Sequence, residues 1–212
     1  VSTVLELCKT RLPDNMYIPA DQIQVLTPTR KGPCGTVNLN RLLQEALNPK
    51  APGKREILWG ERVFRVGDRI MQTRNDYDVV WQKADGTVGT GMFNGDVGRI
   101  VEIDQSGEWL ALDFDGRTAP YSTEMLSEID LAYAQTVHKA QGSEYRCVVL
   151  ATMPSAPSLM VRGVLYTALT RARKLLVMVG DDAAVRSMAA NDKQQKRYSG
   201  LKWRLCHAGE NG

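Results

Sequence analysis

Residues 147–151 read CVVLA and residues 174–180 read KLLVMVG, with VRGVLYTALT (161–170) between them. The two outer runs are almost entirely apolar, and the middle run has the composition of a helix. Strands that are apolar along their whole length, separated by a helix, are typical of a parallel sheet covered on both faces. We also expect Asp181 or Asp182 to cap a further helix over AAVRSMAA (183–190).

The beginning of the chain shows the same α/β alternation. A helix is expected over residues 1–11, ending at Leu12-Pro13, and IQVLTP (23–28) is expected to be a buried edge strand that Pro28 stops. The glycine-rich turn RKGPCG (30–35) follows, and Thr36 is expected to cap the next helix. That helix has an apolar stripe made of Leu39, Leu42, Leu43, Ala46 and Leu47. IDLAYA (129–134) is expected to be another strand of this α/β unit.

The segment between these two portions has a different character. Residues 56–127 show short β-prone runs separated by turn dipeptides such as Asp85-Gly86 and Asp115-Gly116. This pattern predicts a small antiparallel barrel, and RVGDRI (65–70) with NGDVGRIVEI (94–103) resembles the signature of SH3-like barrels. We expect its larger aromatic residues to pack in its core: Trp59, Phe64, Phe93 and Trp109. The predicted domains are therefore 1–55 and 128–212, which form one α/β unit, and 56–127, which is a barrel inserted into it.

Composition and charge narrow the possible functions. The net charge of the chain is +3, but residues 131–174 carry six Lys and Arg against Glu144 alone, and the tail 191–212 is also basic. Such clusters suit a polyanionic partner, although a solvated basic face is the commoner interpretation for a sequence of this pI. The four cysteines are scattered, so we expect no metal site and a reducing, cytoplasmic setting. No apolar run is long enough to span a membrane, and the absence of an initial Met indicates a piece of a longer protein.

Three stretches, in order, resemble a known family. They are QVLTPTRKGPCGTVNLNRLLQ (24–44), AQTVHKAQGSEYRCVVL (134–150) and LYTALTRARKLLVMVG (165–180). Together they resemble motifs IV, V and VI in the second motor domain of superfamily 1 DNA helicases of the RecD type. The resemblance covers nearly the whole chain, and that family carries its SH3-like subdomain between motifs IV and V. It implies a RecA-like parallel-sheet motor domain of the P-loop NTPase type with an inserted SH3-like barrel.

The resemblance implies nucleotide-facing roles for two groups of residues. Arg171 would be the arginine finger that stabilises charge on the transferring phosphoryl group, and Arg30 would also reach the nucleotide phosphates; the alternative for either is a surface ion pair. Gly142, Gln141 and Glu144 would lie at the nucleotide, with Glu144 accepting from a ribose hydroxyl. The alternative for Glu144 is a salt bridge with Arg146 or Lys139, and Arg173 is expected to be structural or solvated.

A second set of residues is implied to contact single-stranded DNA. Hydroxyl, imidazole and ammonium donors suit phosphates and bases, and the set comprises Thr136, His138, Lys139, Thr27, Thr29, Lys31 and Asn38. The alternatives are a packing role for His138 and turn or cap roles for the residues of motif IV. Further exposed candidates for DNA contact lie in the barrel, namely Arg74, Tyr77, Trp81 and Asn94.

The sequence lacks the phosphate-binding motif that an ATPase needs. No G-x-x-x-x-G-K-[ST] occurs, and RKGPCGT has no Lys-Thr pair to hold phosphates and Mg²⁺. The resemblance therefore implies that ATP with Mg²⁺ is held mainly by an N-terminal motor domain of the same protein, and that this chain alone lacks ATPase activity. The expected function is part of an ATP-dependent DNA helicase in recombination or repair, with nuclease-complex subunits as candidate partners. The alternatives are the motor half of a conjugative relaxase-helicase and a non-catalytic binding module.

Overall fold

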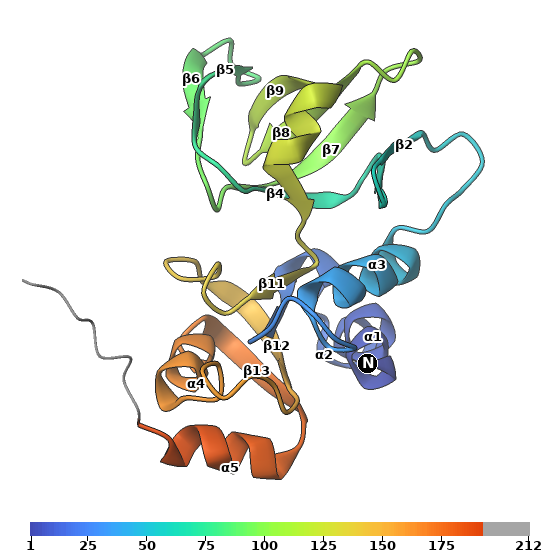
Figure 1. The fold of residues 1–212 in the computed structure, drawn as a ribbon. Helices are drawn as coiled ribbons and strands as arrows, with labels where there is room; N and C mark the ends of the chain where they lie inside the picture. Colours follow the sequence, from blue (N-terminus) through green and yellow to red (C-terminus); the bar gives the residue numbers. More distant parts are fainter. Residues whose placement is uncertain (193–212) are drawn as a thin grey trace, which may run out of the picture.

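The computed structural model describes residues 1–192 of the chain. In Figure 1 a sheet covered by helices lies at the bottom, an antiparallel barrel lies at the top, and the two join beside α3 and β11. The basic residues of the tail from Lys193 onward lie outside the described residues. Within residues 1–192, no helix has the length and apolar character needed to cross a membrane.

Four parallel strands form the lower sheet, in the order β11 (Ala134–Thr136), β1 (Ile23–Thr27), β12 (Tyr145–Thr152) and β13 (Ala172–Gly180). The parallel sheet predicted from CVVLA and KLLVMVG is confirmed, because their strands are direct neighbours. The prediction that β1 is an edge strand is wrong: it pairs on both sides, and all five of its residues are buried. The expected burial of β13 is only partial, since β13 ends the strand order and Met178 is exposed.

Helices cover both faces of this sheet, which explains why its strands are apolar throughout. On one face, α1 (Ser2–Glu6), a π-helical turn (Leu7–Arg11), α2 (Leu12–Met16) and α3 (Thr36–Leu47) pack against Val25 and Val149. On the other face, α4 (Arg162–Leu169) and α5 (Asp182–Ala190) pack against Leu26 and Val148. Neighbouring residues of one strand point to opposite faces, so both faces need apolar side chains.

The helix ends differ from the expectations in two places. The first helical segment runs past Leu12-Pro13 to Met16, and Pro13 is the second residue of α2, directly after the π-helical turn. Thr36 is the first helical residue of α3 rather than its cap, and Gly35 precedes it. At α5 the expected cap is confirmed, since Asp181 accepts from the Ala183 N–H at 2.8 Å.

The barrel begins with the paired strands β2 (Glu56–Trp59) and β3 (Arg62–Arg65). Seven further strands form one sheet in the order β10 (Ile129–Leu131), β4 (Arg69–Gln72), β7 (Val97–Ile103), β8 (Trp109–Phe114), β9 (Arg117–Ser122), β5 (Asp76–Gln82) and β6 (Val88–Met92). Two short 3-10 helices complete the described part of the fold: η2 (Ala20–Gln22) precedes β1 of the lower sheet, and η3 (Thr123–Glu128) precedes β10 of the barrel. Phe64, Phe114 and Tyr121 are fully buried in the core of the barrel. Phe93 and Trp109, which were expected to pack, are 42% and 40% exposed.

The stretch IDLAYA does not form one strand of the lower parallel sheet. Ile129–Leu131 is β10, which pairs antiparallel with β4 of the barrel, and Ala134 begins β11 of the parallel sheet. The chain therefore changes sheets at Ala132 and Tyr133. The cause is that Ile129 fills the barrel core whereas Ala134 packs against the helices of the lower sheet.

A buried carboxylate links the barrel to the lower sheet. One oxygen of Asp68 accepts from Asn48 Nδ2 at 2.7 Å and from the Tyr133 hydroxyl at 2.9 Å. The other oxygen accepts from Gln44 Nε2 at 2.6 Å and from the Arg65 N–H at 2.7 Å. Burial raises the pKa of Asp68, and these hydrogen bonds offset part of that rise. Helix α3, β3 and the chain entering β11 thus meet at one side chain.

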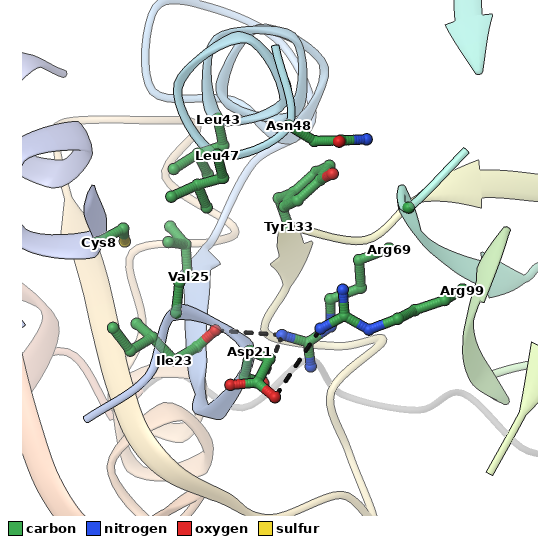
Figure 2. Close-up of a pocket in the computed structure, with 12 residues that line it drawn as sticks. Cys8, Asp21, Ile23, Val25, Leu43, Leu47, Asn48, Arg69, Arg99 and Tyr133 are labelled. Atoms are coloured by element: carbon green, nitrogen blue, oxygen red, sulfur yellow. Dashed lines mark hydrogen bonds and ion pairs between the residues drawn. The ribbon is translucent and has the colours of Figure 1, made fainter. Parts of the chain in front are cut away.

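A cavity of about 270 Å³ lies beside this link, between the N-terminal helices, α3 and the barrel. Figure 2 shows Arg69 and Arg99 at its barrel side, facing Asp21. Arg69 donates to the backbone carbonyls of Ile23 at 3.1 Å and Asp21 at 3.4 Å. Arg99 lies 3.9 Å from the Asp21 carboxylate. These contacts fix the barrel against the amino ends of the parallel strands.

Candidate nucleotide and nucleic-acid site

The turn that follows β1 uses its own backbone to start α3. The N–H groups of Thr36 and Val37 donate to the carbonyls of Thr29 and Arg30 at 3.1 and 3.2 Å. Gly32 has a φ of +89°, a left-handed conformation that favours glycine. Because the first helical N–H groups already have partners, this turn is not a phosphate cradle of the P-loop kind.

The loop between β11 and β12 is a tight turn with polar side chains outside and apolar ones inside. The Thr136 hydroxyl accepts from the Lys139 N–H at 3.3 Å, and the Thr136 carbonyl accepts from the Ala140 N–H at 3.1 Å. Val137 and Ala140 are buried, whereas His138 and Gln141 are exposed. Gly142 has a φ of +86°, so the sharp end of the turn requires its freedom. The exposed position of His138 disfavours the packing alternative.

We name a hollow between the barrel and the lower sheet the junction pocket. Its cavity volume is about 610 Å³, and its walls come from α3, β3, β10, β11 and the two loops just described. It brings together Arg30, Asn38, Thr136 and Lys139. Burial lowers the pKa of Lys139, Asp130 partly offsets this, and the charge of Arg30 lowers it further. Two cations that repel each other beside a pocket are an arrangement that an anion would stabilise.

The structure places Arg30 with residues expected to contact DNA. Its expected companion in catalysis, Arg171, does not line the junction pocket. Asn38 lines the pocket but also serves its helix, since its Nδ2 donates to the Pro33 carbonyl at 2.8 Å. Its Oδ1 accepts from Arg41 at 3.1 Å.

The two threonines of motif IV lie elsewhere. Thr27 and Thr29 line a separate hollow of about 440 Å³ at the carboxyl ends of β1 and β12, together with Lys31 and residues 153–156. Thr27 is buried, and its hydroxyl accepts from the Thr29 N–H at 3.5 Å. The Thr29 hydroxyl donates to the Lys31 carbonyl at 3.3 Å. Both hydroxyls therefore take part in the turn.

Arg171 ties the end of α4 to the loop after β11. Its Nη1 donates to the Ser143 carbonyl at 2.9 Å and its Nε donates to the Thr167 carbonyl at 3.2 Å. The side chain is half-buried, and no carboxylate forms an ion pair with it within residues 1–192. The guanidinium thus forms no direct ion pair in this part of the chain, but its charge acts on the nearby Glu144 carboxylate.

Glu144 pairs with Arg173, at 2.6 Å between Oε2 and Nε. Hydrogen bonding to Arg173, together with its charge, lowers the pKa of Glu144. The partners expected in the alternative, Arg146 and Lys139, are not used; Arg146 instead donates to Gln22 at 2.6 Å. Both members of the Glu144–Arg173 pair are exposed, so the pair contributes little stability and is accessible to a ligand.

Two further residues at these surfaces were missed from the sequence. Arg41 is exposed in the junction pocket and follows Asn38 by three positions, a helical spacing that would have placed both on one face. Phe93 forms an exposed pair with Tyr77 on the barrel. Trp81, by contrast, is only partly exposed and packs against the barrel core.

The fit of a nucleotide with Mg²⁺ can be judged from the donors present. The described residues contain no group of three or more His, Cys, Asp or Glu arranged for a metal ion. In the turn before α3, the N–H groups of Gly35, Thr36 and Val37 already donate to backbone carbonyls. What remains is the guanidinium of Arg171, which forms no ion pair among the described residues, and the exposed Glu144–Arg173 pair. These groups offer contacts to a nucleotide but do not by themselves form a site that holds one with Mg²⁺.

Comparisons with known proteins agree with this geometry. Residues 39–114 match the family described as the ATP-dependent RecD-like DNA helicase SH3 domain, and residues 131–179 match the UvrD-like helicase C-terminal domain. The ATP-dependent RecD2 DNA helicase of Deinococcus radiodurans is 37% identical over 185 residues, which is 87% of this chain and 24% of that protein. The RecBCD enzyme subunit RecD of Mycolicibacterium smegmatis is 32% identical over 189 residues, or 89% of this chain and 30% of that protein.

Solved structures show the same fold. The Pif1 helicase from Bacteroides, in complex with ADP-AlF3 and single-stranded DNA, matches 99% of this chain and 50% of its own length, with a TM-score of 0.52 and 16% identity. The fold and the two family matches thus define the chain as the second motor domain of a helicase with an inserted SH3-like barrel. Within this class it belongs to the RecD-type helicases of superfamily 1. It spans less than a third of the length of these two curated relatives.

Proposed function

We propose that this chain is the C-terminal motor part of an ATP-dependent DNA helicase that holds single-stranded DNA in the junction pocket. The observation that carries the proposal is the meeting of Arg30, Thr136 and Lys139 in one pocket, although they come from two motifs more than a hundred residues apart in the chain. The two cations and the Thr136 hydroxyl together offer donors that suit a phosphate. The grouping of Arg30 with residues expected to contact DNA favours a DNA phosphate over the nucleotide as its partner.

The nucleotide side of the proposal rests on Arg171. The other motor domain would hold ATP and Mg²⁺, and ATP supplies the energy of translocation when it is bound there. Arg171 would present its charge to the phosphates, and its bond to Ser143 joins it to the loop that carries Thr136 and Lys139. Binding at either side can then shift the same loop. Assembly with other subunits and a place in recombination or repair belong to the same proposal, because the RecD relatives are RecBCD subunits.

The DNA side is tested by titrating fluorescent single strands with this chain at several salt concentrations. Each lost phosphate contact lowers the slope of log K against log salt by roughly 0.7 for single strands. We expect Arg30→Ala and Lys139→Ala each to produce that change, and Arg186→Ala on the exposed face of α5 to produce none. Unchanged slopes in both pocket variants would contradict the proposed groove.

The nucleotide side is tested after this chain is joined to its N-terminal motor half. Arg171→Ala is expected to lower DNA-stimulated ATP turnover by about 10³-fold or more, as is typical of arginine fingers. Arg173→Ala, which removes only the exposed pair with Glu144, is expected to leave turnover within about twofold. Turnover within twofold for Arg171→Ala, in a variant that unfolds like the wild type, would rule out the finger.

A further inference from the structure

Two aromatic side chains on the barrel form an exposed pair that the barrel core does not use. Tyr77 is 66% exposed and Phe93 is 42% exposed. Their ring centroids lie 5.8 Å apart with an angle of 74° between the planes, an edge-to-face contact. Neither residue belongs to the buried cluster that fills the barrel. An apolar surface that a fold exposes without structural need is a sign of binding.

The backbone around the pair holds the rings in place. Gly91 has a φ of +95°, and a Cβ there would lie 3.0 Å from the Phe93 ring, so a larger residue would displace the ring. The Asn94 N–H donates to Asn75 Oδ1 at 2.9 Å. Asn75 Nδ2 donates to the Tyr77 hydroxyl at 3.5 Å. The two turns that carry the rings are therefore tied to each other before any ligand arrives.

The pair also lies close to the junction pocket along the barrel. Gln72 follows Met71, which lines that pocket. The Gln72 carbonyl accepts from the Gly95 N–H and its N–H donates to the Asp96 carbonyl, both at 2.9 Å. The turn after Phe93 is thus bonded to the residue next to the pocket wall. In the view of Figure 1, β5, β6 and the loop after β11 lie on the same side of the molecule.

The charges near the pair favour a base over a phosphate as its ligand. Arg74 is exposed, but Asp78 is exposed as well, and Asp96 is already paired with Arg117 at 3.0 Å. The surface therefore has no excess of cations. Stacking on an aromatic ring needs none, because every base offers a π face, and each stacked base contributes on the order of 1–3 kcal/mol.

We propose that Tyr77 and Phe93 form a stacking platform for a base of the single strand that extends from the junction pocket. The platform would add affinity without reading sequence and without adding to the salt dependence. The inference rests on the proposed function, because it requires that single-stranded DNA occupies the pocket.

The test combines affinity with a reporter of stacking. Single strands carrying 2-aminopurine at successive positions are titrated with this chain, and anisotropy gives the affinity while quenching reports stacking. Tyr77→Ala and Phe93→Ala are each expected to weaken binding by about 5- to 150-fold. They should abolish quenching at one or two positions and leave the salt slope unchanged. Tyr77→Phe is expected to keep both signals.

Trp109→Ala is the matched control, since Trp109 is 40% exposed on β8 and is expected to have no role in DNA binding. Full affinity and full quenching in Tyr77→Ala and Phe93→Ala would overturn the platform. If Arg30→Ala still lowered the salt slope in that case, the proposed function would stand. Loss of unwinding by the full-length protein with unchanged DNA affinity would assign the pair to a protein contact and would also overturn the platform.

Discussion

Asp68 is the residue on which the attachment of the barrel depends most. It is fully buried, accepts four hydrogen bonds and has no cationic side chain among its hydrogen-bond partners. All its partners are donors, so an amide in its place would turn its NH₂ group towards other N–H or O–H groups. A buried donor without an acceptor costs free energy that the folded state cannot recover.

We therefore predict that Asp68→Asn lowers the free energy of unfolding by about 2–4 kcal/mol at neutral pH. Urea unfolding followed by circular dichroism measures this change. Asp78→Asn is the control, because that carboxylate is exposed and the same substitution there should change stability by less than about 0.5 kcal/mol. Equal effects at the two positions would show that the four hydrogen bonds contribute no stability.

The wild type and the Asp68→Asn variant should also differ in their pH dependence. Burial raises the pKa of Asp68 above its ordinary value of 3.8, so the folded state holds this proton to higher pH than the unfolded state. The contribution of this group to stability is then complete below about pH 4 and declines as pH rises through the raised pKa. The amide introduced by Asp68→Asn cannot titrate. The stability difference between the two proteins, measured by urea unfolding, should accordingly be larger at pH 4 than at pH 7.

The sequence permits individual residues to be assigned only where local rules decide them. The cap at Asp181 was predictable, because a short acceptor side chain directly before a helix usually accepts from one of the first helical N–H groups. The exposure of Phe93 was not predictable. An aromatic ring at the end of a β-prone run can enter the core or point to solvent, and the conformation of the neighbouring turn decides which. Gly91 and the Asn75–Asn94 bond decide that turn, and they are set by contacts between distant residues.

Among the elements, α5 allows the most direct test of a local prediction. Asp181→Ala is expected to lower the free energy of unfolding by about 1 kcal/mol, since the Ala183 N–H loses its acceptor. Asp181→Asn should retain most of the stability. Asp182→Ala, one position inside the helix, is expected to cost only a few tenths of a kcal/mol. Thermal unfolding of the three variants gives the comparison, and an effect of Asp182→Ala as large as that of Asp181→Ala would contradict the cap.

The elements also show where sequence patterns stop being informative. The central strands were predictable because five or more apolar residues in a row have few other uses in a soluble domain. Residues 129–134 were assigned to one strand, yet they contain two strands of different sheets. Strands of three residues are too short to show a period, so only the packing of Ile129 and Ala134 into separate cores reveals the break. The motif positions were predictable, whereas the grouping of Arg30 with Lys139 required the fold.

The whole molecule is predicted to unfold as one cooperative unit. Besides Asp68, the buried Arg65 of β3 donates to Glu45 of α3 at 2.6 Å and to Glu56 of β2 at 3.1 Å. In a Trp203→Phe background the remaining tryptophans, Trp59, Trp81 and Trp109, all lie in the barrel. Their fluorescence should change at the same urea concentration as the helical circular dichroism signal. Two separated midpoints would show that barrel and motor unfold independently.

The strand that leaves the barrel has a mechanical consequence for the motor. Only Ala132 and Tyr133 separate the end of β10 from the start of β11, and the Tyr133 hydroxyl is held by Asp68. A connection this short, held by a hydrogen bond, leaves little freedom for the barrel to move independently of β11. A displacement of the barrel would therefore be transmitted along β11 to the loop that carries His138, which begins within a few residues. Under the proposed function, the barrel would act as a lever whose pivot lies one strand away from the loop proposed to contact DNA.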